Sequence, residues 1–72
     1  MTAFQFLLNK KESGELSILL QIGLPTHLVS WMEYYDYWQK HPDESRVEIS
    51  HHFHVTKSTI DRAIHWMHRQ LV

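Results

Sequence analysis

Apolar residues near the end of the chain recur at the three- and four-residue spacing of a helix. This spacing places their side chains in one stripe along a helical cylinder. Thr56 precedes the stripe, and a hydroxyl at this place caps a helix by accepting a hydrogen bond from a first-turn amide. The pattern predicts a helix over residues 57–71. The stripe consists of Ile60, Ala63, Ile64, Met67 and Leu71.

A second, shorter helix is predicted just before it. Ser45 and Glu48 have the S-x-x-E spacing of a capping box, in which hydroxyl and carboxylate each accept a bond from a backbone amide. Ile49 and Phe53 follow four residues apart, on one face of this helix. We therefore expect helices at residues 46–53 and 57–71, joined by a turn of about three or four residues as in a helix-turn-helix.

The same region resembles a known family. The segment VTKSTIDRAI and the residues before it are similar to the bacterial helix-turn-helix pattern A-x-x-x-G-V-S-x-x-T-V-x-R-A-I. In that family the first helix supports the second, and the second lies in the DNA major groove. The resemblance covers residues 45–71 and implies a DNA-binding protein of a bacterium, phage or other mobile element. The matching residues are Ile49, Ser50, Phe53, Val55, Thr56, Thr59, Ile60, Arg62, Ala63 and Ile64.

Two positions depart from the family pattern. Ser50 stands where the family has alanine, and it is small enough for close helix packing. His54 stands where the family has glycine, at the turn position that takes a positive φ. Glycine adopts positive φ without strain, whereas histidine is one of the other residues enriched there. We expect the motif to persist, with a slightly strained or wider turn.

The first 44 residues are predicted to be supporting helices. Residues 2–11 and 15–22 carry apolar side chains at helical spacing; a strand is an alternative for the second segment, but its leucines favour a helix. Gly23 is expected to end that helix. Thr26 is expected to cap a long helix reaching Lys40, because no glycine or proline interrupts it. One face of the long helix carries Leu28, Trp31, Met32, Tyr35 and Trp38, and Tyr35 and the two tryptophans are expected to face the core.

These elements predict an all-α fold, a small three- to four-helix bundle with a C-terminal helix-turn-helix. A chain of 72 residues is one domain, with residues 1–44 supporting residues 45–71. Because the chain ends on the second helix of the motif, we expect neither a β-wing nor a separate effector domain. The core is expected to combine Trp31 or Tyr35 with Ile49, Phe53, Val55, Ile60, Ile64 and Met67.

Composition narrows the classes of function. The chain contains no cysteine, no Gly-rich phosphate loop and no convincing catalytic triad, so we expect no enzyme. It has no apolar run long enough to span a membrane and no signal peptide, which favours the cytoplasm. Formal net charge is −1, unusual for a DNA-binding protein. However, residues 1–44 hold three lysines against six acids, and residues 45–72 hold four Lys or Arg against two acids.

The predicted DNA-reading residues lie on the polar face of the last helix. Arg and Lys can pair with guanine, and hydroxyls and helix N-terminal amides bind phosphates. Asp61 opposes tight binding unless it accepts from cytosine N4 or orients Arg62. The candidate DNA-binding residues are Thr56, Lys57, Ser58, Asp61, Arg62, His65, Arg46 and Arg69.

Histidines and tyrosines raise two further questions. His65 and His68 have a spacing that can bind zinc, but no cysteine and no H-E-x-x-H pattern accompanies them. We therefore expect no metal and no cofactor. Tyr34 and Tyr37 are either an exposed partner surface or are covered by the N-terminal segment; the sequence leaves both open.

Two functions from different classes remain. The first is sequence-specific binding of double-stranded DNA in transcriptional regulation, with occlusion of a site as the simplest mechanism. A homodimer is expected on DNA, since four basic residues make few phosphate contacts and a two-fold pair doubles them. The alternative is a protein–protein interaction adaptor that uses a helix-turn-helix fold without binding DNA. The acidic first part of the chain favours the adaptor, and the basic last part disfavours it.

Overall fold

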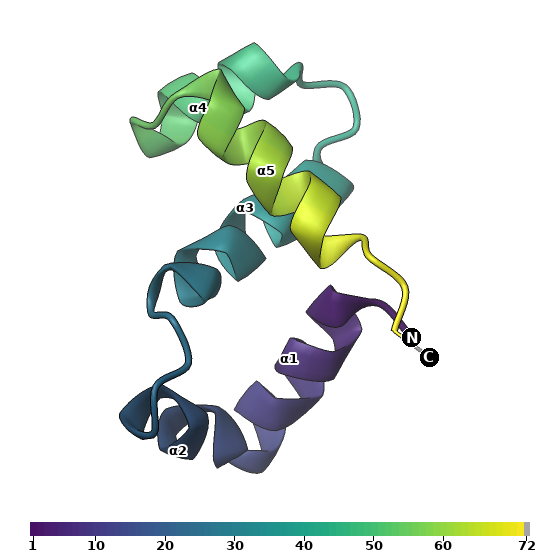
Figure 1. The fold of residues 1–72 in the computed structure, drawn as a ribbon. Coiled ribbons are helices and arrows are strands. Elements are labelled where there is room, and N and C mark those ends of the chain that lie inside the picture. The colour runs from purple at the N-terminus through teal and green to yellow at the C-terminus, as the bar shows by residue number, and fades with distance from the viewer. Residues whose placement is uncertain (72) are drawn as a thin grey trace.

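The computed structural model describes residues 1–71, which form five helices and an isolated β-bridge between Thr2 and Gln70, without a strand. The all-α prediction is confirmed, but the structure has one helix more than the three or four expected. Figure 1 shows α1 and α2 at one end of the molecule, α4 and α5 at the other, and α3 between them. The helices are α1 (Ala3–Ser13), α2 (Glu15–Gln21), α3 (His27–Lys40), α4 (Arg46–Phe53) and α5 (Lys57–Met67).

Gly14 accounts for the additional helix. Thr2 caps α1, because its hydroxyl accepts a bond from the Gln5 amide at 3.1 Å. α1 ends at Gly14, whose φ of 82° is left-handed and whose amide donates to the Lys11 carbonyl at 3.2 Å. A residue without a side chain takes this φ freely, so α2 can begin at the next residue. The strand alternative for residues 15–22 is wrong, since Glu15–Gln21 is helical.

α3 is the central helix. It contacts α1, α4 and α5, whereas α2 contacts no helix except α1. Thr26 is the N-cap residue of α3 as predicted, but its backbone is already helical and its side chain makes no capping bond. The amides of Leu28 and Val29 instead donate to the carbonyls of Pro25 and Thr26, each at 3.2 Å. A turn that starts at Pro25 therefore replaces the side-chain cap.

The core lies where α1, α3, α4 and α5 meet, and α2 adds Leu16 to it. Tyr35 is the aromatic residue of this core, at 2% exposed, and Trp31 is only partly buried. Phe53 and Val55 were expected in the core but are also partly buried, because they sit at the C-terminal end of α4 and in the turn. The side chains that form the core are Phe4, Leu7, Leu16, Leu28, Met32, Tyr35, Ile49, Ile60, Ile64 and Met67.

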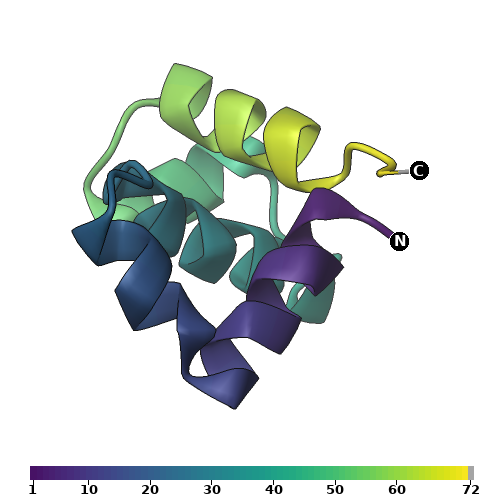
Figure 2. The same ribbon diagram turned by 60° about the horizontal axis from the view of Figure 1, so that its bottom comes forward.

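α5 ends at Met67, four residues before the predicted end at Leu71. The chain then runs antiparallel to the N-terminus, where the Ala3 amide donates to the Arg69 carbonyl and the Leu71 amide to the Met1 carbonyl, each at 2.8 Å. Leu71 consequently leaves the apolar stripe and is 37% exposed. In Figures 1 and 2 the two termini lie side by side.

Candidate nucleic-acid interface

α4 begins with the predicted capping box. The Ser45 hydroxyl accepts a bond from the Glu48 amide at 3.1 Å, and the Glu48 carboxylate accepts one from the Ser45 amide at 3.2 Å. Ile49 and Ser50 then turn inward and are buried. The Ser50 hydroxyl donates to the Val47 carbonyl at 2.6 Å, so the polar group that replaces a family alanine is satisfied inside α4.

The turn after α4 depends on His54. This residue has φ 57° and ψ 42°, and it is the one non-glycine residue with positive φ among residues 1–71. The His54 amide donates to the His51 carbonyl at 3.3 Å, and the Val55 amide donates to the Ser50 carbonyl at 3.0 Å. These two bonds form a Schellman motif with histidine in the place usually taken by glycine. The left-handed turn expected at His54 is present.

Thr56 starts α5 as predicted. Its hydroxyl accepts a bond from the Thr59 amide at 3.3 Å. With residues 54–56 as the only connection, α4 and α5 are held close and pack against each other. Local bonds therefore define the end of α4, the turn and the start of α5 before any contact with α3 is counted.

α5 has a fully buried face and an exposed face. Ile60, Ala63 and Met67 have no exposed surface, and Ile64 is 4% exposed. The opposite face carries polar and basic side chains, and its contents match the expectation from the sequence. The exposed residues at the N-cap and along the outer face of α5 are Thr56, Lys57, Ser58, Arg62 and His65.

Asp61 joins two basic side chains on this exposed face. Lys57 donates to its Oδ2 and Arg46 of α4 donates to its Oδ1, each at 2.9 Å. The hydrogen bond from Lys57, and to a smaller extent that from Arg46, lowers the pKa of Asp61 below its usual value. Asp61 makes no ion pair with Arg62 among the described residues, so of the two conditions for tight binding, contact with cytosine N4 remains.

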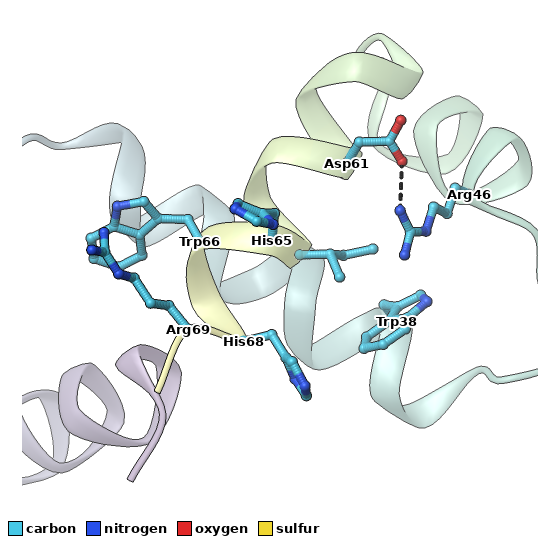
Figure 3. Close-up of a pocket in the computed structure, with 8 residues that line it drawn as sticks. Trp38, Arg46, Asp61, His65, Trp66, His68 and Arg69 are labelled. Atoms are coloured by element: carbon cyan, nitrogen blue, oxygen red, sulfur yellow. Dashed lines mark hydrogen bonds and ion pairs between the residues drawn. The ribbon is translucent and has the colours of Figure 1, made fainter. Parts of the chain in front are cut away.

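A groove of about 720 Å³ lies beside this network, between α3 and the second half of α5 (Figure 3). The guanidinium of Arg46 lies 5.9 Å from the centre of the Trp38 ring, at one end of the groove. The His68 Nδ1 atom lies 2.9 Å from the hydroxyl of the buried Tyr35. The groove is lined by Trp38, Arg46, Asp61, Ile64, His65, Trp66, His68 and Arg69.

The groove contains both expected and unexpected residues. Arg46, Asp61, His65 and Arg69 were expected at the site, although Arg69 lies beyond the end of α5. Trp38 was expected in the core. It is only partly buried because it lies near the end of α3, where Arg46 rather than another apolar helix covers its ring. The spacing of Lys57 and Asp61 could have indicated their ion pair, since residues four apart are neighbours on a helix.

The other histidines and tyrosines lie apart from this face. Among residues 1–71 there is no group of three His, Cys, Asp or Glu side chains able to hold a metal ion. Tyr37 is stacked between His41 and His52, at centroid distances of 3.8 and 4.6 Å. Tyr34 packs on Phe53 at 4.8 Å. Both tyrosines are therefore partly buried against α4, not beneath the N-terminal segment.

The Tyr37 hydroxyl has a partner of its own. It donates to the Glu44 carboxylate at 2.6 Å, and this bond, with burial, raises the pKa of Tyr37. The bond ties the end of α3 to the linker before α4. It also removes the hydroxyl from the surface expected to pair with a partner.

In the part of the chain that the structure describes, no helix has both the length and the apolar character needed to cross a membrane. Comparison of the chain with protein-family models, with curated proteins and with solved structures finds no match.

Proposed function

We propose that this protein binds double-stranded DNA sequence-specifically, with α4, the turn and α5 acting as a helix-turn-helix without a wing. α5 would lie in the major groove, and α4 would support it. In this role the protein would repress or activate transcription and would not act as an enzyme. Occlusion of a DNA site needs no further domain and is the simplest mechanism.

One observation carries this proposal, namely the division of α5 into two faces. Its buried apolar residues pack into the core and hold the helix in place, while Lys57, Ser58, Arg62 and His65 are exposed. Such a face has donors for base edges and phosphates at its N-terminal half, where base contacts are made in this motif. An ordinary solvated helix would need neither the tight turn nor this grouping of basic side chains.

Affinity should be modest and sensitive to salt. The formal net charge is −1, and one carboxylate already engages two of the basic residues at the face. Each phosphate contact contributes about 0.9 to the slope of log K against log salt concentration. A protein with few such contacts depends on base contacts, chiefly from Arg62, for useful affinity.

The test is fluorescence anisotropy of a labelled duplex of mixed sequence at two salt concentrations, followed by selection of bound sequences from a random pool. We expect salt-sensitive binding and enrichment of one sequence. Lys57→Ala should weaken binding to all sequences alike. Lys11→Ala is the matched control, because it removes an exposed lysine from α1. Equal losses from both variants, or no binding by the natural chain, would contradict the proposal.

A homodimer on DNA is part of the proposal. Two copies related by a two-fold axis would read half-sites about 34 Å apart. Two apolar surfaces could form the pair, namely Tyr34 with Tyr37, or the N-terminal segment with Phe4 and Phe6. Tyr34 and Tyr37 are packed on α4, and Phe4 is buried. Phe6, which is 40% exposed on α1, remains the candidate. Light scattering should give two protomers for each bound duplex, and one protomer would rule out the dimer.

A second candidate function rests on α2. Ile18 and Ile22 are 57% and 77% exposed, at the end of the molecule farthest from α4 and α5. Exposed apolar residues close together are typical of protein-binding surfaces. The adaptor role is therefore kept as the alternative, and the two candidates use different regions of the molecule.

A further inference from the structure

Asp61 is the only acidic residue of α5, and it lies at the centre of the face proposed to meet DNA. Its two carboxylate oxygens are both occupied, Oδ1 by Arg46 of α4 and Oδ2 by Lys57 of α5, each at 2.9 Å. Figure 3 shows the Asp61 carboxylate pointing toward the Arg46 guanidinium at the rim of the groove. One carboxylate therefore joins cations from two helices.

Arg62, the next residue, is in a different situation. Among residues 1–71 it has no ion pair and no side-chain hydrogen bond, and it is exposed. Of the three cations near the start of α5, Lys57 and Arg46 of α4 thus share the single negative charge of Asp61, whereas Arg62 pairs with no acidic side chain among the described residues. The ion pairs of α4 and α5 therefore distinguish Arg62 from Arg46 and Lys57.

The network is too exposed for a large role in stability. The side chains of Arg46, Lys57 and Asp61 are 44%, 55% and 35% exposed. Ion pairs at this level of exposure are weakened by water and salt and contribute little to folding. The main consequence of Asp61 is therefore for the charge that α5 presents to a charged partner.

We propose that Asp61 determines specificity on this face, by competing with DNA phosphates for Arg46 and Lys57 so that arbitrary sequences are bound weakly. The inference rests on the DNA binding proposed above. Phosphate contacts supply most non-specific affinity, so a carboxylate that competes for the phosphate-binding cations lowers that component first. Base contacts made by Arg62 are left intact.

At a matching DNA sequence, a base contact of the Asp61 carboxylate offsets the affinity that its negative charge removes. A carboxylate on a recognition helix can accept a hydrogen bond from the N4 amino group of cytosine. Where a cytosine meets Asp61, the carboxylate makes a favourable contact, whereas elsewhere it only repels phosphates and competes for cations. Asp61 therefore widens the difference between matching and arbitrary DNA, at the expense of overall affinity.

The test compares Asp61→Asn with Asp36→Asn. Asp36 is the matched control because it also pairs with a lysine four residues away, Lys40 at 2.9 Å, but on α3 and outside the proposed face. Each additional phosphate contact raises affinity about 5-fold at physiological salt. Asp61→Asn frees one or two cations, so it should tighten binding to a mixed-sequence duplex by about 5- to 30-fold and steepen the salt slope by about 1 to 2.

For each variant, binding is also measured to a duplex that the natural protein selects from a random pool. We expect a smaller gain there, so that discrimination between the two duplexes falls in Asp61→Asn and is unchanged in Asp36→Asn. Equal changes in affinity and salt slope for both variants would overturn the inference. A lower melting temperature of Asp61→Asn with an unchanged salt slope would also overturn it, because Asp61 would then only stabilise the fold. Weaker binding of Asp61→Asn to every duplex would overturn it too. Absence of duplex binding by both the natural protein and Asp61→Asn would instead overturn the proposed function, and this inference with it.

Discussion

The two ends of the molecule are built differently. At one end, α4 and α5 are each capped by a side chain, and a Schellman motif joins them. At the other end, α2 begins at Gly14 without a side-chain cap and contacts no helix except α1. The buried face of α5 is complete, whereas α2 leaves Ile18 and Ile22 exposed.

This difference separates the two candidate functions. A rigid helix pair with a polar and basic outer face suits recognition of DNA, because its side chains are held at fixed positions. A less supported helix with exposed isoleucines suits contact with another protein. Pairs of variants, with one substitution at each end of the molecule, can therefore test which end carries which function. They also test whether α5 contributes more than α2 to stability.

The largest expected effect is on the core of α5. Ile60→Ala should lower the free energy of unfolding by about 2–5 kcal/mol, because it leaves a cavity at a side chain with no exposed surface. Ile18→Ala at the exposed face of α2 should change it by less than about 0.5 kcal/mol. Urea unfolding measures both, and similar losses would show that α2 is more firmly packed than its exposure indicates.

The next effect concerns recognition. Arg62→Ala should cost about 1–3 kcal/mol in binding to the selected duplex and relax the preference at one base pair. Its melting temperature should stay near that of the natural chain, because the Arg62 side chain has no ion pair in the part of the molecule described. Selection from a random pool with each protein gives the measurement. An unchanged preference would remove Arg62 from the reading face.

Capping provides a smaller contrast in stability. Ser45→Ala should cost about 0.5–2 kcal/mol, since it removes the hydroxyl that accepts the Glu48 amide in the capping box. Ser17→Ala in α2 is the matched control, because that hydroxyl only adds a bond to the Gly14 carbonyl. Thermal unfolding of the two variants should differ in midpoint, and equal midpoints would mean that α4 does not depend on its cap.

The smallest effect concerns the two left-handed residues. His54→Gly should be neutral or stabilise the fold by up to about 1 kcal/mol, because glycine accepts a φ of 57° without strain. Gly14→Ala, at φ 82°, should have the opposite sign even though a Cβ meets nothing within 4 Å. A clear loss of stability in His54→Gly would mean that the histidine side chain makes contacts that outweigh the strain.

The contrast between the two ends also explains what could be predicted from the sequence. The capping box at Ser45, the cap at Thr56 and the turn at His54 depend on neighbouring residues, so pattern and spacing were sufficient for them. The end of α5 was predicted too late because the pairing of Gln70 with Thr2 is a contact between distant parts of the chain. The side chain of Thr26 makes no capping bond for a different, local reason, since Pro25 already starts the turn.

The candidate site was predicted as a set of residues but not as a network. Helical periodicity placed Lys57, Ser58, Arg62 and His65 on the outer face of α5 correctly. It could not show that Arg46 reaches Asp61 from α4, because these residues are 15 positions apart and meet only through packing of the two helices. Trp38 was assigned to the core for the same reason.

The most direct measurement is a titration of the ¹⁵N-labelled protein with duplex DNA, followed by amide chemical shifts. The account predicts that the largest shifts occur at residues 56–62, with shifts at Arg46 and none along α2. At a fixed DNA concentration these shifts should become smaller as salt is added, because phosphate contacts weaken. Shifts confined to α2, around Ile18 and Ile22, or no shifts at any DNA concentration, would contradict the assignment of DNA binding to α5.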